Sequence, residues 1–204
     1  LNRIHNYFFA KAIDQAREGG LIAFVTSKGV LDAPGNANIR EYINRHTEFL
    51  GAVRLPNNAF TKTANTEVVT DVIFLRKSAD GNINSENAHK FTNVVEVDAT
   101  HRDGATEKVS VNEYFVNNPQ HMLGDIEAGG LYSRSDYTLN DNGTAAKLTT
   151  VIRQMLPSNV YSKAKSAMGL QANDVMRTVE FEKEGNIVEH NGTLYKNENG
   201  IAEE

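Results

Sequence analysis

Cysteine is absent from this 204-residue sequence, so neither a disulfide framework nor a thiolate metal site can form. The absence fits a reducing compartment, and we expect a cytoplasmic protein. No apolar run approaches the roughly 20 residues that span a bilayer. The N-terminus also lacks a basic region followed by an apolar signal core. The sequence therefore predicts a soluble protein with no membrane partner.

Signatures of several enzyme classes are missing as well. The 6 histidines are scattered without the spacing of metal ligands, so we expect no metal site. The sequence contains neither a Gly-x-Ser-x-Gly nucleophile elbow nor a glycine-rich phosphate loop ending in Gly-Lys-Ser/Thr. No residue is predicted to be catalytic.

Charge divides the chain into two parts. Residues 1–78 hold 10 basic and 7 acidic side chains, whereas residues 79–204 hold 11 and 19. Because backbone affinity for nucleic acid comes largely from Lys and Arg, any DNA contact is expected in the first part. A polar, Asn-rich stretch at residues 78–88 is the predicted boundary. We therefore predict one domain over residues 1–78 and a mixed α+β region over residues 79–204, which is a linker or an accessory domain.

The first part has the pattern of an α/β sheet. An amphipathic helix ends at Gly19-Gly20, and its aromatic residues Tyr7, Phe8 and Phe9 are expected to pack in the core. The apolar run at residues 21–25 has no polar alternation, which predicts a strand buried on both faces of a parallel sheet. A helix follows, for which Asn38 and Glu41 resemble a capping box. Strands at residues 49–55 and 67–77 are predicted to be antiparallel neighbours, because no crossover helix separates them.

The second part alternates short strand and helix patterns. We expect a strand around residues 91–98, a short helix that ends before Pro119, a strand within residues 131–139 and a helix over residues 144–156. Asn191-Gly192 between two apolar stretches predicts a hairpin near the C-terminus. The residues after it are expected to fray.

Several short sequence segments together resemble the C-terminal half of the catalytic domain of N6-adenine DNA methyltransferases. They are residues 19–25 (GGLIAFV), residues 53–56 (VRLP) with Phe60 four residues on, and residues 70–75 (TDVIFL). The resemblance is closest over residues 1–77 and is nearest to restriction modification subunits and to the methylase-helicase proteins of phages and conjugative elements. Residues 111–124 resemble the segment after the methylase domain in the latter. The resemblance implies a Rossmann-type sheet.

The resemblance also implies DNA as substrate and S-adenosylmethionine as cofactor of the parent protein. The family binds the donor at a glycine-containing turn and holds the adenine amino group with an Asn/Asp-Pro-Pro-aromatic motif. Neither motif is present, and Asn118-Pro119 lacks the second proline and the aromatic residue. The chain also starts at Leu1, directly in a helical pattern. We therefore expect a fragment of a longer methyltransferase that is inactive alone and binds no cofactor.

Substrate contacts are predicted in the loops that follow the strands. Ligands of open α/β sheets bind outside the carboxyl ends of strands, which makes Ser27 and Lys28 candidates, although a solvated loop is the simpler reading. Phe60 could stack on a flipped base or anchor its loop in the core. The remaining candidates are the amides of Asn57 and Asn58, which also suit a turn, and the cations Arg54 and Lys62, which also suit plain surface charge.

Two other functions stay open. The chain could be a noncatalytic interaction module whose acidic second part binds a protein, or a small-molecule enzyme whose chemistry has no visible residues. If the earlier strands of the sheet are absent, the strand at residues 21–25 presents an unpaired edge, which proteins usually cover. We expect other domains of the same polypeptide or a second copy of the chain to lie there.

Overall fold

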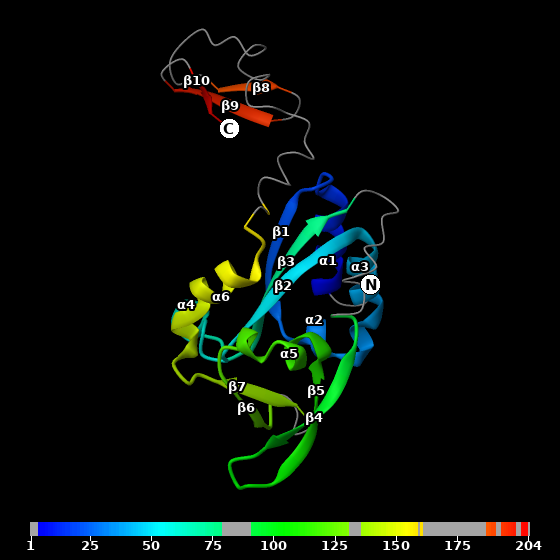
Figure 1. The fold of residues 1–204 in the computed structure, drawn as a ribbon, viewed down its shortest axis with the longest axis vertical. Helices are drawn as coiled ribbons and strands as arrows, with labels where there is room; N and C mark the ends of the chain where they lie inside the picture. The colour runs from blue at the N-terminus through cyan, green and yellow to red at the C-terminus, as the bar shows by residue number, and fades with distance from the viewer. Residues whose placement is uncertain are drawn as a thin grey trace.

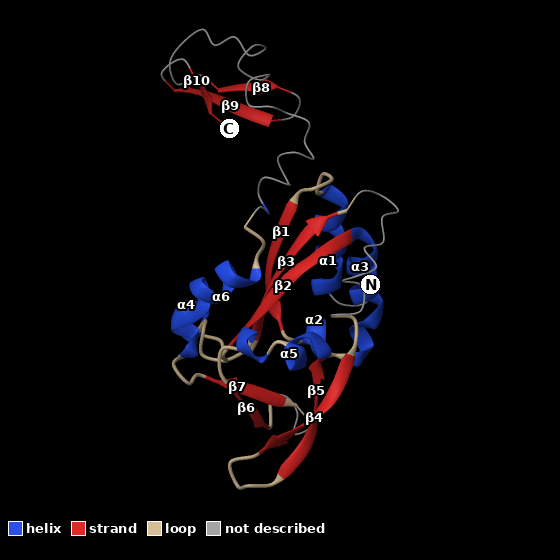
Figure 2. Cartoon of the chain, viewed as in Figure 1, coloured by secondary structure: helices blue, strands red, loops and turns tan. Residues whose placement is uncertain are grey.

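The computed structural model describes residues 4–78, 91–130, 136–158, 160, 187–190, 193–198 and 201–203. Figure 1 shows the order of the elements and Figure 2 their types. The helices are α1 (Ile4–Gln15), α2 (Gly29–Asp32), α3 (Ala37–His46), α4 (Thr61–Ala64), α5 (Glu113–Asn117) and α6 (Leu148–Met155). Short 3-10 turns lie at Pro34–Asn36, Pro119–His121 and Thr144–Lys147.

The first three strands form what we call the N-terminal sheet. It consists of β1 (Leu21–Ser27), β2 (Thr47–Leu55) and β3 (Thr70–Lys77) in the order β1-β3-β2. The predicted antiparallel pairing of the second and third strands is confirmed, and β3 is antiparallel to β1 as well. Since both outer strands oppose β3, β1 and β2 run in the same direction. The predicted succession of helix, strand, helix, strand and strand is also confirmed.

The prediction that the first strand is buried on both faces is wrong. β1 lies at an edge of the sheet, and its residues alternate between exposed and partly buried. Ile22 and Phe24 pack against the main hydrophobic cluster, whereas Leu21 and Val25 are 44% and 57% exposed. An apolar run indicates a strand, but it does not indicate how many of its faces other elements cover.

Helix α1 buries a single narrow stripe. Phe9 is 1% exposed and packs on Phe24 of β1, with 4.3 Å between ring centroids. Tyr7 and Phe8 are 51% and 52% exposed, so the prediction of core packing is confirmed for Phe9 and wrong for the other two. The buried stripe is narrow and consists of Asn6, Phe9, Ala10 and Ile13.

Helix α3 starts earlier than predicted. It begins at Ala37, so its N-cap position is Asn36 and not Asn38. The Asn36 side chain is buried and makes no capping bond; its amide donates to the carbonyl of Gly29 at 2.6 Å, and its oxygen accepts from Asn6 of α1 at 3.1 Å. A polar contact between helices therefore takes the place of the predicted capping box.

The described residues between 91 and 160 add two pairs of strands and two helices. β4 (Val94–Thr100) pairs antiparallel with β5 (Thr106–Asn112), and β6 (Asp125–Ala128) pairs with β7 (Tyr137–Asn140). The strand predicted near residues 91–98 and the helix ending before Pro119 are confirmed as β4 and α5. The helix predicted over residues 144–156 is α6, preceded by a 3-10 turn. Of the strand predicted within residues 131–139, the first five residues lie outside the described part, and β7 covers the last three.

The C-terminal hairpin prediction is confirmed. β8 (Ile187–His190) pairs antiparallel with β9 (Thr193–Glu198), which also pairs with β10 (Ile201–Glu203). β10 falls within the residues expected to fray. The predicted linker lies almost entirely outside the described residues.

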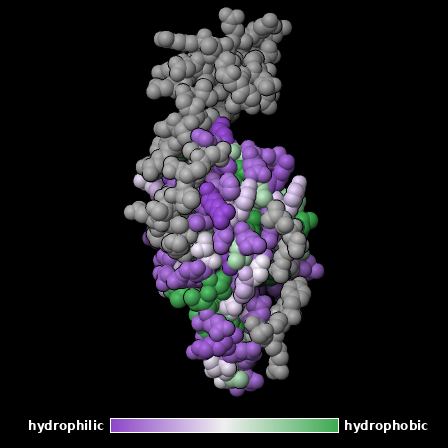
Figure 3. Space-filling view, turned by 90° about the vertical axis from the view of Figure 1, so that its right-hand side faces the viewer, coloured by the Kyte–Doolittle hydropathy of each residue, from purple (hydrophilic) through white to green (hydrophobic). Residues whose placement is uncertain are grey.

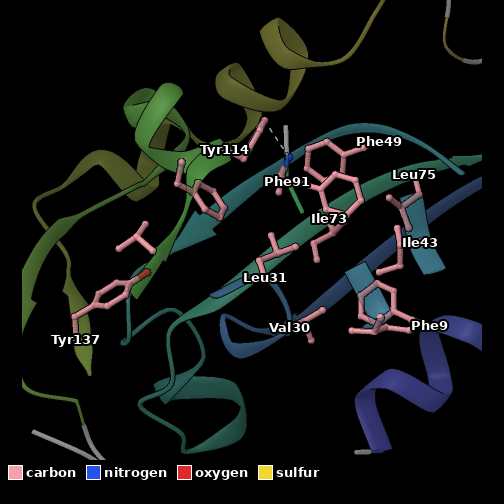
Figure 4. Close-up of a cluster of buried hydrophobic side chains, with 14 of the residues drawn as sticks. Phe9, Val30, Leu31, Ile43, Phe49, Ile73, Leu75, Phe91, Tyr114 and Tyr137 are labelled. Carbon is pink, nitrogen blue, oxygen red and sulfur yellow. Dashed lines mark hydrogen bonds between the residues drawn. The ribbon is translucent and has the colours of Figure 1, made fainter. Parts of the chain in front are cut away.

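The main core joins elements from both parts of the chain. Figure 4 shows this cluster, which extends from Phe9 of α1 to Tyr137 of the second part and has Phe49 beside Phe91. Phe49 of β2 stacks on Phe91, with 4.3 Å between ring centroids. A smaller cluster covers the opposite face of β2 and β3, where α6 packs on Val53, Leu55 and Val72. The N-terminal sheet thus has one face that is covered across all three strands and one face that is covered over β2 and β3 only.

The surface of the described part is mostly polar. On the face in Figure 3, hydrophilic residues predominate and hydrophobic ones gather in small patches. Among the helices of the described residues, none is long and apolar enough to cross a membrane.

Candidate functional site

The carboxyl ends of β1 and β2 meet at one end of the N-terminal sheet. Ser27, the last residue of β1, and Leu55, the last residue of β2, both pair with Thr70, the first residue of β3. The loops that follow β1 and β2 therefore leave the sheet side by side. All the predicted substrate-contact residues except Arg54 lie either at the end of β1 or in the segment that joins β2 to β3.

Arg54 lies just inside this end of the sheet and is fully buried. Its side chain is 0% exposed, and its guanidinium makes two parallel hydrogen bonds to the carboxylate of Asp71 on β3, each 2.7 Å long. Arg54 and Asp71 are directly opposite each other in the strand register. A third bond of 2.7 Å joins the guanidinium to Asp32 of α2. One cation therefore holds two buried carboxylates.

Tyr137 of β7 and Asn112 of β5 complete this cluster. The Tyr137 hydroxyl donates to Asp32 at 2.7 Å and also contacts the Arg54 guanidinium. The backbone N–H of Asn112 donates to the other oxygen of Asp32 at 2.9 Å. The Asn112 amide donates to the carbonyls of Leu31 and Phe91, at 2.9 and 2.8 Å. We call Asp32, Arg54, Asp71, Asn112 and Tyr137 the buried polar cluster.

Charge in the buried polar cluster shifts several pKa values. Burial lowers the pKa of Arg54, but the carboxylates of Asp32 and Asp71 outweigh it and hold the pKa above its ordinary value. Burial raises the pKa of Asp71, and the nearby charge of Asp32 raises it further, against the opposing effect of Arg54. Burial likewise raises the pKa of Tyr137 well above 10. The guanidinium stays charged, and the phenol stays protonated as a donor.

These contacts correct the expectation for Arg54. A surface cation that meets phosphate was predicted, but the guanidinium is enclosed by protein atoms and cannot reach a phosphate. The sequence contained a signal for the burial, because Arg54 and Asp71 each interrupt an apolar strand pattern. Opposite charges inside two neighbouring buried strands are paired far more often than solvated. Asp32, Asn112 and Tyr137 had no comparable signal.

A cavity of about 460 Å³ opens beside the buried polar cluster. Its wall includes Ser27, Lys28 and Asn57 from the two loops, and Asp136 and Tyr137 from the second part of the chain. The Lys28 ammonium pairs with the Asp136 carboxylate and lies 4.3 Å from the centroid of the Tyr137 ring. The structure therefore gathers three of the predicted contact residues at one cavity, with Lys28 only 14% exposed.

The rim of this cavity carries charge of both signs. Arg102 pairs with Glu127 at 2.8 Å, and the Asn140 amide donates to the same carboxylate at 2.8 Å. Glu67 also lines the cavity and is exposed. The arrangement offers hydrogen-bond donors and acceptors rather than a concentrated positive field.

The other predicted residues lie outside this cavity. Phe60 is half-buried and packs against the smaller hydrophobic cluster, which matches the loop-anchor alternative. The carbonyl of Asn58 accepts from the backbone N–H of Thr61 at 3.2 Å in a turn, and its side chain is exposed. Lys62 is exposed on α4.

A second cavity, of about 500 Å³, lies at the outer edge of β2. Tyr114 of α5 lines it, and its Oη lies 2.6 Å from Nδ1 of His121 and 3.5 Å from Sδ of Met155. The backbone N–H of Ala52 donates to the same hydroxyl at 3.2 Å. Burial raises the pKa of Tyr114 to about 12 and lowers the pKa of His121. The neutral forms of both groups are therefore favoured.

No group of His, Asp and Glu side chains among the described residues is arranged to hold a metal ion.

Comparison with known proteins identifies the family. The model of the N-6 DNA methylase family matches residues 2–122, which is more than half of the chain. The chain belongs to the N-6 DNA methylase family. The match includes the N-terminal sheet, the β4–β5 hairpin and α5, and it crosses the predicted boundary at residue 78. It therefore covers four residues of the buried polar cluster, and Tyr137 lies beyond it.

One curated relative of this methylase-family chain is the defense against restriction protein B of Escherichia phage P1. The two are 31% identical over 72 residues, which is 35% of this chain and 3% of the relative. The chain thus spans only a small share of the relative's length. No solved structure matches the chain.

Proposed function

We propose that this chain forms the closing part of the catalytic sheet of a DNA adenine-N6 methyltransferase. The observation that carries the proposal is the family match over residues 2–122, because it covers the elements that surround the sheet end. In this reading the N-terminal sheet is the last portion of a larger Rossmann-type sheet, in a protein of the kind found in restriction systems and mobile elements.

The strand order supports this proposal. In β1-β3-β2 the two outer strands run in the same direction, and the reversed third strand is inserted between them. The family resemblance implies such a reversed last strand. The carboxyl ends of β1 and β2 lie together, as a ligand site in an open α/β sheet requires.

The methyl donor of the parent would be S-adenosylmethionine, and we propose that this chain alone neither binds it nor methylates DNA. The family's motif for binding the donor and its motif for holding the adenine amino group are both absent from the sequence. The residues around the 460 Å³ cavity do not fit the donor either. Tyr137 is the single aromatic residue among the described lining residues, and at 1% exposure its ring cannot stack on adenine.

The role left to the described residues is to position DNA at the sheet end. Lys62 is an exposed cation next to the loop of Phe60, and the amide of Asn57 lies in the cavity wall. Lys28 is less available, because Asp136 pairs with its ammonium. Lys62 is therefore expected to give weak binding that depends on salt, because each phosphate contact releases counterions.

A DNA titration at several salt concentrations tests the proposal. We expect weak binding whose salt dependence falls by about one phosphate contact in Lys62→Ala. Lys108→Ala is the control. Lys108 is an exposed cation on β5, which belongs to the β4–β5 hairpin and not to the N-terminal sheet, and its loss should leave the salt slope unchanged. Absence of DNA binding even at low salt would contradict the proposed DNA contact.

A noncatalytic interaction module is the second candidate function. The observation that favours it is the group of exposed apolar residues on α1 and β1. In that case the chain would show no DNA binding but would form a stable complex with a protein.

A further inference from the structure

Met155, the last residue of α6, joins this helix to both β2 and α5. Its side chain packs against the smaller hydrophobic cluster. The backbone of Gly51 in β2 lies so close that a Cβ added there would be 2.4 Å from Sδ and 2.7 Å from Cγ of Met155. The sulfur also accepts a hydrogen bond of 3.5 Å from the Tyr114 hydroxyl of α5. The thioether therefore fills the space between the helix and the sheet.

The second cavity gives solvent access to this thioether. Met155 lines the cavity of about 500 Å³ and is only partly buried. Asn117, Gln154 and Pro157 line the same cavity and are exposed, so the cavity opens to the surface. Hydrogen peroxide needs little more room than a water molecule, and a cavity of this size admits it. A small oxidant can therefore reach Sδ without unfolding the chain.

The other methionine in the described part of the chain, Met122, is placed differently. It packs against the main hydrophobic cluster, and its backbone forms a bridge to Arg54 of β2. Met122 lines neither of the two cavities described above. Met168 and Met176 lie outside the described residues. Of the two described methionines, Met155 is therefore the one that a dissolved oxidant meets.

We propose that Met155 is a site of reversible oxidation by peroxides, and that its sulfoxide releases α6 from the N-terminal sheet. A lone pair of Sδ attacks one oxygen of hydrogen peroxide, so that an S–O bond forms and the O–O bond breaks. The proton of the transferred hydroxyl passes to the second oxygen, which leaves as water. The sulfur loses two electrons and the peroxide gains them. Methionine sulfoxide reductases reverse this change. The inference does not depend on the proposed function.

The added oxygen has room only on the side of the cavity. One lone pair of Sδ faces the Tyr114 hydroxyl, and the contact with the Gly51 backbone leaves no space for another atom. A sulfoxide is polar, and burying it without a hydrogen-bond partner costs free energy. The oxidised side chain is therefore stable only where water reaches it, which draws it out of the smaller hydrophobic cluster.

Helix α6 has few other contacts that could hold it in place. Val151 is its one buried residue, and Leu148 and Ile152 are only partly buried. A short helix with so few buried contacts opens easily once one of them is lost. Phe60 packs against the same cluster, so the opening of α6 also loosens the loop that follows β2. Oxidation of Met155 thereby reaches the loop that carries Asn57 to the candidate site.

Mild treatment with hydrogen peroxide, followed by mass spectrometry, tests the site. In the folded chain we expect Met155 to be oxidised several-fold faster than Met122, because only Met155 lines an open cavity. In urea, where both side chains are exposed, the two rates should become equal. A folded chain in which Met122 is oxidised as fast as Met155 overturns the proposed site.

Hydrogen exchange tests the release of α6. After oxidation we expect the amides of residues 148–156 to exchange about tenfold faster, while those of the N-terminal sheet keep their rates. Reduction by methionine sulfoxide reductases should restore the slow exchange. An oxidised chain whose α6 amides exchange as slowly as before overturns the release. Equal acceleration throughout the sheet overturns it too, because the chain would then have loosened as a whole.

Two substitutions separate Met155 from the other methionines. Met155→Leu keeps an apolar side chain of similar volume, so it should fold and should abolish the effect of peroxide on α6. Met155→Gln places a polar group of similar length at the same position and should speed the exchange of α6 without peroxide. A Met155→Leu chain whose α6 still responds to peroxide overturns the proposal, since another residue would then be the cause.

Discussion

The two faces of the N-terminal sheet are built in different ways. One face meets α1, α3 and the second part of the chain, and it encloses an ion cluster in which the side chains of Arg54 and Asp71 are 0% exposed. The other face is covered by α6 over β2 and β3, and it is open over β1, where Val25 is 57% exposed. The comparison teaches that the closed face holds the fold together, whereas the open face leaves apolar side chains of β1 exposed among the described residues.

The largest expected effect is on the closed face. Arg54→Met leaves the carboxylates of Asp32 and Asp71 buried without a cation, and breaking a buried ion pair in this way costs about 3–5 kcal/mol of unfolding free energy. Urea denaturation followed by circular dichroism measures it. Arg45→Met is the control, because the pair of Arg45 with Glu41 is solvent-exposed and should change stability little. Equal losses in the two variants would contradict the importance of the buried polar cluster.

A smaller effect is expected where α6 meets the sheet. Gly51 has a φ of +141°, and a Cβ there would lie 2.4 Å from Sδ of Met155. Gly51→Ala should therefore push α6 from the sheet and cost about 1–3 kcal/mol, through overpacking and backbone strain. Gly35→Ala is the matched control, since no atom lies within 4 Å of its added Cβ. A Gly51→Ala variant as stable as the wild type would show that α6 is loosely held.

The smallest effect is a pH dependence at the same edge of β2. Burial lowers the pKa of His121, so the folded protein binds the imidazole proton less readily than the unfolded chain does. The contribution of the neutral His121 to the free energy of unfolding is fully present above the ordinary histidine pKa of about 6.5. It is lost as the pH falls below that value through the pKa of the folded state. His121→Gln should flatten this part of the curve of unfolding free energy against pH. An unchanged slope would exclude His121 as the cause.

The sequence was sufficient for much of the sheet. Apolar runs located all three strands, and the short loop between the second and third predicted their antiparallel pairing. The sequence could not give the exposure of β1 or of Phe8, because an apolar residue looks the same whether or not another element covers it. Covering elements such as α6 come from distant parts of the chain.

Only part of the candidate site could be predicted from the sequence. Ser27 and Lys28 followed from the rule that ligands bind outside the carboxyl ends of strands, whereas Asn57 was a candidate only because an amide can bond a base edge. The contacts of Lys28 with Asp136 and Tyr137 did not follow, since those residues lie more than 100 positions away and no local pattern connects them. Burial of Arg54 was visible only as a charge inside an apolar strand.

The central claim is that this chain supplies the end of a methylase sheet without its donor site. Isothermal titration calorimetry of the 204-residue chain with S-adenosylmethionine tests this claim most directly. The account predicts no saturable heat, because the donor motif is absent from the sequence and the 460 Å³ cavity at the sheet end presents no accessible ring for adenine to stack on. Tight, saturable binding of one donor molecule per chain would contradict it.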